Sequence, residues 1–170
     1  MARANTQYGF TLIELLMYVV IVSTLLAALS GFFIMTAQAR LKNQSIAEVD
    51  QQGALVIQAI AQSVRNANSI SAPATGVTDS TLSLIVPTSS ASPTIFSLSS
   101  GVLQIKEGSG AVVSLTNNEV TASNFTIQNL SRSGGYGAVQ ISFTLTRVNG
   151  GNRNEFDYQK TFTTTASIRP

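Results

Sequence analysis

The sequence predicts an α+β protein: a long N-terminal helical spine packed on an antiparallel β-sheet head. An uncharged apolar segment at residues 15–39 leads into a second segment whose apolar residues recur every three or four positions. Beyond residue 80, apolar residues instead alternate with polar ones, which is the period of a β-strand. The length of 170 residues accommodates one domain of ordinary size plus such an appendage.

The composition excludes several classes of function. Charged residues make up 11% of the chain, against about 25% in a typical soluble domain. Without cysteine, the chain cannot form a disulfide scaffold, a cysteine zinc site or a thiol nucleophile. Without histidine, a Ser-His-Asp enzyme is excluded. The net charge of +2 comes from few ionisable groups and does not indicate a basic surface.

The first half of the predicted helix is apolar all round. Residues 15–39 carry no charge and give about 38 Å of helix at ~1.5 Å per residue, enough to cross a hydrocarbon core of about 30 Å. Glu14 lies just inside this run, where a carboxylate at the membrane centre costs at least about 2.5 kcal/mol. We therefore expect Glu14 to lie near the headgroups or to have a specific purpose.

The segment Gly-Phe-Thr-Leu-Ile-Glu-Leu-Leu at residues 9–16 resembles the prepilin motif of type IV pilins and type II secretion pseudopilins. The resemblance implies that residues 1–9 are a leader, that prepilin peptidase cuts between Gly9 and Phe10, and that the new Phe10 amine is methylated. It further implies that Glu14 pairs with the Phe10 amine of another subunit during assembly. The alternative is a protonated or snorkelling Glu14 with no partner. A glycine without Cβ suits a narrow protease site.

The second half of the helix is amphipathic. No proline interrupts the chain from Phe10 to Ala72, so we predict one helix of about sixty residues that ends between Asn68 and Ser71. Residues 10–39 form its membrane and filament-core half, and residues 40–71 its amphipathic half. The predicted docking stripe consists of Ile46, Val49, Val56, Ile57, Ile60, Val64 and Ala67.

Residues 72–170 form the predicted head. The segment 71–80 contains proline and glycine without periodicity and is interpreted as a linker. We predict one sheet of about six or seven strands, ending in a hairpin that turns at residues 149–152. The strands are expected at 81–86, 94–98, 102–106, 112–116, around 125–130, at 139–145, and on a return strand carrying Phe156, Tyr158, Phe162 and Ile168.

The head offers little chemistry. Glu155 and Asp157 are two apart and are expected on one face of a strand, as solvated edge charges in preference to a Ca²⁺ site or an acid–base pair. The glycine-rich segment 131–137 lacks a phosphate-loop ending and is interpreted as a flexible loop. We expect no catalytic residues, no metal and no cofactor. Six basic groups against five acidic ones are too sparse for a typical nucleic-acid patch.

The sequence thus predicts a structural subunit of a type IV pilus or type II secretion-like pseudopilus, and a minor (initiating or tip) component rather than an enzyme. The resemblance implies other pilin subunits, prepilin peptidase, an inner-membrane assembly platform and, before assembly, the lipid bilayer as partners. It places the protein in the cytoplasmic membrane with its head outside, and then in the filament. Two alternatives stay open: a filament-tip module for DNA uptake or adhesion, although nothing in the sequence supports DNA, and a single-pass membrane protein without a filament.

Overall fold

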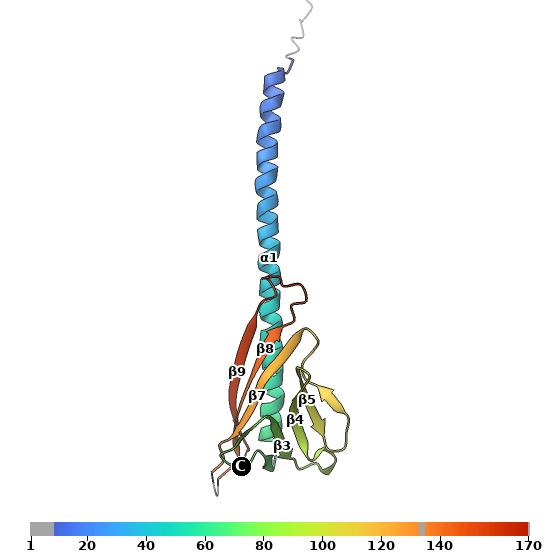
Figure 1. The fold of residues 1–170 in the computed structure, drawn as a ribbon, viewed down its shortest axis with the longest axis vertical. Helices are drawn as coiled ribbons and strands as arrows, with labels where there is room; N and C mark the ends of the chain where they lie inside the picture. The colour runs from blue at the N-terminus through green and yellow to red at the C-terminus, as the bar shows by residue number, and fades with distance from the viewer. Residues whose placement is uncertain (1–8, 133–134, 170) are drawn as a thin grey trace, which may run out of the picture. The chain divides into compact units, whose positions relative to one another are not determined.

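A single long helix precedes a β-rich region in the chain (Figure 1). The computed structural model describes residues 9–132 and 135–169. The chain divides into two compact units, residues 1–40 and residues 41–170, which we describe in turn. The helix, α1, extends from Leu12 to Arg65 and contributes to both units. The predicted α+β class is confirmed.

In the first unit, the helix exposes its entire surface. Every described residue from Gly9 to Arg40 is exposed, as expected for a helix that is apolar all round and has no partner in the same unit. The serine and threonine side chains within this part of the helix bond to the backbone of the preceding turn. Ser30 Oγ donates to the Leu26 carbonyl at 2.8 Å, and Thr36 Oγ1 donates to the Phe32 carbonyl at 2.9 Å. Such bonds satisfy hydroxyl groups in an apolar environment.

In the second unit, α1 buries one stripe. Its buried residues recur every three or four positions, in agreement with the predicted amphipathic pattern. They are Ser45, Val49, Gly53, Val56, Ile60, Ala61 and Val64.

The helix ends at Arg65, earlier than the predicted range of Asn68 to Ser71. The difference has a tertiary cause. The Asn68 N–H donates to the Ile85 carbonyl at 2.7 Å, which draws the chain into a sheet. The next residues then form strand β1.

The strands of the described residues form two antiparallel sheets, where the sequence had predicted one. The first sheet has the order β1-β3-β4-β5-β6 and the second the order β2-β7-β8-β9. The first comprises β1 (Ser69–Ala72), β3 (Thr81–Ile85), β4 (Thr94–Ser99), β5 (Val102–Glu107) and β6 (Val112–Ser114). The second comprises β2 (Thr78–Asp79), β7 (Val120–Asn129), β8 (Ala138–Arg147) and β9 (Gln159–Ser167).

The predicted linker at residues 71–80 is wrong in part. It contains the end of β1 and all of β2, which pair with β3 and β7 respectively. Both strands are short and gain their partners from distant parts of the chain, so neither shows a periodicity of its own. A 3-10 turn, η1 (Ser89–Ala91), follows β3.

The final hairpin is confirmed in its pairing and corrected in its connection. β8 and β9 pair along their whole length, from Ala138 opposite Ser167 to Thr146 opposite Gln159. The connection covers residues 148–158 instead of a tight turn at 149–152, and Phe156 and Tyr158 lie in it rather than on the return strand. Asn149 explains the longer loop, because its side chain bonds both the N–H and the carbonyl of Arg153 at 3.0 Å.

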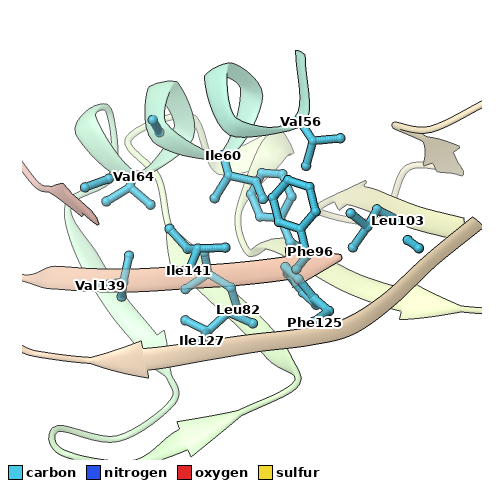
Figure 2. Packing of buried hydrophobic residues seen from close by; sticks show 14 of the residues in the cluster. Val56, Ile60, Val64, Leu82, Phe96, Leu103, Phe125, Ile127, Val139 and Ile141 are labelled. Carbon is cyan, nitrogen blue, oxygen red and sulfur yellow. The ribbon is translucent and has the colours of Figure 1, made fainter. Parts of the chain in front are cut away.

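One hydrophobic core joins both sheets to the helix (Figure 2). Val56, Ile60 and Val64 extend from α1 towards the strands. The largest fully buried strand residues are Leu82, Leu84, Phe96, Leu103, Ile127, Ile141, Phe143 and Leu145. At about 25 cal/mol per Å² of apolar area, this burial is the main stabilising contribution to the head.

Candidate processing and assembly site

The scissile peptide predicted between Gly9 and Phe10 precedes the helix. Both residues are exposed and non-helical, and the Phe10 side chain is 73% exposed. A Cβ added to Gly9 would meet nothing within 4 Å among the residues that the structure describes, so their fold does not require a glycine there. A requirement for glycine at this position would therefore come from another molecule that grips the chain. Of the predicted leader, residues 1–8 lie outside the described residues.

Thr11 caps the helix directly after this peptide. The Glu14 N–H lies 3.4 Å from Thr11 Oγ1 and 3.1 Å from the Thr11 carbonyl oxygen, and the Leu15 N–H donates to the same carbonyl at 3.2 Å. The pattern Thr-x-x-Glu is typical of a helix N-terminus, where a threonine side chain satisfies an otherwise unpaired N–H. The cap fixes the helix start two residues after Phe10.

Glu14 contacts a tyrosine one turn further along the helix. Tyr18 Oη donates to Glu14 Oε1 at 3.4 Å, and the Tyr18 ring meets the Phe10 ring edge-on with centroids 6.0 Å apart. The two predicted assembly residues, Phe10 and Glu14, are therefore joined through Tyr18. Among the described residues, Glu14 forms no ion pair.

An apolar groove adjoins these residues on the same helix face. It has a volume of about 570 Å³ and is open to the surroundings. Its lining residues follow helical spacing: Leu15, Tyr18, Val19, Val22, Ser23 and Leu26, together with Phe10.

The same helix is suited to a bilayer. Among the described residues, α1 is the one helix that is long and apolar enough to cross a membrane, judged by length and composition. None of its most apolar window is buried against the rest of the protein. The residues on which assembly is predicted to depend therefore lie at the start of a potential membrane span.

The acidic pair of the head lies elsewhere than predicted. Glu155 and Asp157 belong to the loop between β8 and β9, not to a strand face. No group of three or more metal-ligating side chains occurs among residues 9–132 and 135–169. Instead, Arg153 Nη2 lies 3.4 Å from Glu155 Oε1. A hydrogen bond from the Glu155 backbone, and then one from Arg153, lower the pKa of the Glu155 carboxyl.

Two lysines attach the last hairpin to the helix. Lys42 Nζ donates to the carbonyls of Asn154 and Asp157 at 3.2 and 2.5 Å. Lys160 Nζ bonds Asp50 Oδ1 at 2.9 Å, and this hydrogen bond raises the pKa of Lys160. These contacts hold the loop and β9 in place and are structural in kind.

Sequence reasoning named Gly9, Phe10 and Glu14 as site residues and did not name three residues that contact them, the start of the helix or the head. Thr11 and Tyr18 were detectable, the first from the Thr-x-x-Glu cap and the second from its spacing of four from Glu14. The role of Lys42 was not detectable from the sequence, because its carbonyl partners are more than one hundred residues away in the chain. The predicted loop at 131–137 includes residues 133–134, which lie outside the described residues.

Comparison with known proteins bears on this N-terminal segment. A family model described as the prokaryotic N-terminal methylation motif matches residues 4–30, which include Gly9, Phe10 and Glu14. Searches of curated proteins and of solved structures found no match. The motif is that of structural subunits, not of enzymes. The motif match over residues 4–30, together with the long helix and the β-rich head, supports a likeness to the type IV pilin and pseudopilin family.

Proposed function

We propose that this protein is a structural subunit of a type IV pilus or a type II secretion-like pseudopilus, assembled through its N-terminal helix. The observation that carries the proposal is the helix surface from Phe10 to Ala39. It is apolar and fully exposed, and Glu14 is its single charged residue. An apolar surface of this extent needs lipid or other helices around it.

We propose that the same helix uses both environments in turn. Before assembly it spans the cytoplasmic membrane, with the head outside the cytoplasm. In the filament it packs against the helices of other subunits, for which the groove beside Tyr18 offers a matching surface. An inner-membrane assembly platform moves the subunit from the membrane into the filament.

We propose that processing links the two states. Prepilin peptidase cuts after Gly9, and the exposed Phe10 amine is methylated. The new ammonium can neutralise the Glu14 carboxylate of a neighbouring subunit, which removes the cost of an unpaired charge in an apolar filament core. The accessible position of the Gly9–Phe10 peptide before the capped helix supports this order of events.

We propose that the protein is a minor subunit, located at the start or the tip of the filament. The head lacks cysteine and therefore any disulfide to close a C-terminal loop. Counting the subunits in purified filaments tests this part. A copy number comparable to that of the most abundant subunit would contradict it.

Mass spectrometry of the mature N-terminus tests the proposal most directly. The chain is expressed with and without prepilin peptidase, and the expected product begins at Phe10 with one added methyl group. Gly9→Val should remain uncut, because a branched side chain obstructs the scissile position. Gly31→Val adds the same bulk on the open side of the helix and should be cut normally. An uncut chain, or a cut elsewhere, would favour a single-pass membrane protein without a filament.

A further inference from the structure

A pocket at the C-terminal end of α1 carries two arginines. It has a volume of about 360 Å³ and is lined by Gln62, Arg65, Asn66, Ser167 and Arg169. The Arg169 N–H donates to the Arg65 carbonyl at 3.4 Å, so the segment after β9 is attached to the end of the helix (Figure 1). All five residues belong to the second unit.

The charges of this pocket are unbalanced. None of its five described lining residues is acidic. Within residues 9–132 and 135–169, the ion pairs involve Arg147, Arg153 and Lys160, and none involves Arg65 or Arg169. Two guanidinium groups that share one pocket repel each other, and a bound anion would offset that repulsion.

The helix end itself does not prevent an anion from binding. The carbonyls of a last helical turn carry partial negative charge, which is unfavourable for an anion by about 0.3–1 kcal/mol. Here three of those carbonyls accept backbone hydrogen bonds. The Gln62 carbonyl accepts from the Asn66 N–H at 3.0 Å, and the Val64 carbonyl accepts from the Ala67 N–H at 3.2 Å. The Arg65 carbonyl accepts from Arg169.

We infer that this pocket binds a single phosphate group. Its lining is rich in donors: two guanidinium forks, the amides of Gln62 and Asn66, and the hydroxyl of Ser167. The two oxygens of a carboxylate match one arginine fork, whereas a phosphate group presents further oxygens to the second fork and the amides. Phosphate therefore uses more of the donors that this pocket provides.

The pocket fits one phosphate group rather than a length of nucleic-acid backbone. Proteins that bind DNA through its charge usually contact several phosphates with a row of basic residues. The two arginines of this pocket can contact only one phosphate group. The group can come from free phosphate or from a phosphodiester, and the two sources differ in charge and in their dependence on pH. The inference does not depend on the proposed filament function.

Titration of the full chain in detergent micelles, followed by amide NMR signals, tests the inference. The probes are inorganic phosphate and dimethyl phosphate, each added at constant ionic strength with chloride as balance. The expected result is saturable shifts at Arg65, Asn66, Ser167 and Arg169. Tighter binding of inorganic phosphate, strengthening with pH as the monoanion loses its second proton and becomes a dianion, identifies free phosphate. Tighter binding of dimethyl phosphate, without that pH dependence, identifies a phosphodiester.

Four variants separate a specific site from general attraction of anions. Arg65→Gln and Arg169→Gln should each weaken binding about tenfold, since each removes charge-assisted hydrogen bonds. Arg132→Gln removes the same charge from an exposed arginine that does not line the pocket, and should change binding less than about twofold. Arg169→Lys keeps the positive charge but lacks the guanidinium fork, so its loss of affinity for phosphate should lie between the losses of these variants.

Three outcomes would overturn the inference. The first is amide shifts that do not saturate with phosphate. The second is a loss of binding in Arg132→Gln equal to the loss in Arg65→Gln and Arg169→Gln. The third is that acetate, added as a further probe, binds as tightly as both phosphate probes. Arg169 lies after the last strand, so its variants keep the test valid even if Arg65→Gln fails to fold.

Discussion

The Phe162 ring of β9 occupies the space beside Gly53 of α1. A Cβ on Gly53 would lie 2.2 Å from Cζ of that ring and 2.4 Å from its Cε1. Gly53 is buried, and the ring stacks on Phe143 with centroids 5.4 Å apart. The glycine therefore allows the edge strand of the second sheet to approach the helix closely.

The first prediction concerns this contact. Gly53→Ala should destabilise the head despite the gain of about 1 kcal/mol in helix propensity, because overpacking costs about 1–3 kcal/mol and the stacked ring has little room to move. Thermal unfolding should show a lower Tm. Gly31→Ala is the matched control, since a Cβ there meets nothing within 4 Å.

A second substitution distinguishes steric overlap from other effects of alanine. Combining Gly53→Ala with Phe162→Leu should recover part of the lost Tm, since the smaller side chain frees space. If the two effects simply add, the contact between Gly53 and Phe162 does not cause the loss.

The second prediction concerns Glu14. Glu14→Ala and Glu14→Gln should both reduce incorporation into filaments, because neither side chain can neutralise the ammonium of a neighbouring Phe10. The measure is the amount of each variant in sheared filaments relative to the membrane pool. Tyr18→Phe removes the hydroxyl that contacts Glu14 and keeps the carboxylate, so it should be incorporated far better than either. Normal incorporation of both Glu14 variants would contradict the assembly pair.

The third prediction concerns Lys42. Lys42→Met should loosen the loop between β8 and β9, because the ammonium bonds two of its carbonyls. Hydrogen exchange at residues 154–158 should become faster, and stability should fall by about 1–2 kcal/mol. Lys106→Met removes the same charge from an exposed strand position and is the control. Equal exchange in the two variants would show that net charge, not this contact, governs the loop.

The fourth prediction concerns pH. The folded protein lowers the pKa of Glu155 from its ordinary value of 4.5, so the ionised form contributes stability above that value. The contribution disappears as pH falls through the lowered pKa. The Tm of the wild type should therefore exceed that of Glu155→Gln at neutral pH, and the two should converge in acid. A difference independent of pH would indicate packing instead of charge.

The sequence predicted most of what depends on local pattern. The amphipathic stripe through Val56 and Ile60 is buried, and the hairpin from β4 to β5 pairs as expected from its Ser-Ser-Gly turn. The start of the helix was also detectable from Thr11 and Glu14, which are close in sequence, although the prediction did not use them.

What the sequence did not predict depends on distant partners. β2 has two residues, and it is a strand because Thr78 and Asp79 pair with Gln128 and Ile127 of β7. Likewise Phe156 alternates with polar neighbours as a strand residue would. It lies in a loop, and the guanidinium groups of Arg147 and Arg153 contact its ring at 5.9 and 5.4 Å. The periodicity of apolar residues predicts neither the pairing of β2 with β7 nor the contact of Phe156 with the two arginines.

The position of the Thr11 cap has a consequence for maturation. The described hydrogen bonds of the cap join Thr11 to Glu14 and Leu15, all on the C-terminal side of the Gly9–Phe10 peptide. Loss of the leader would leave the helical geometry from Leu12 onwards unchanged and convert a neutral amide at Phe10 into a cation. Cleavage would thus add a positive charge before the start of the helix without changing the helix geometry.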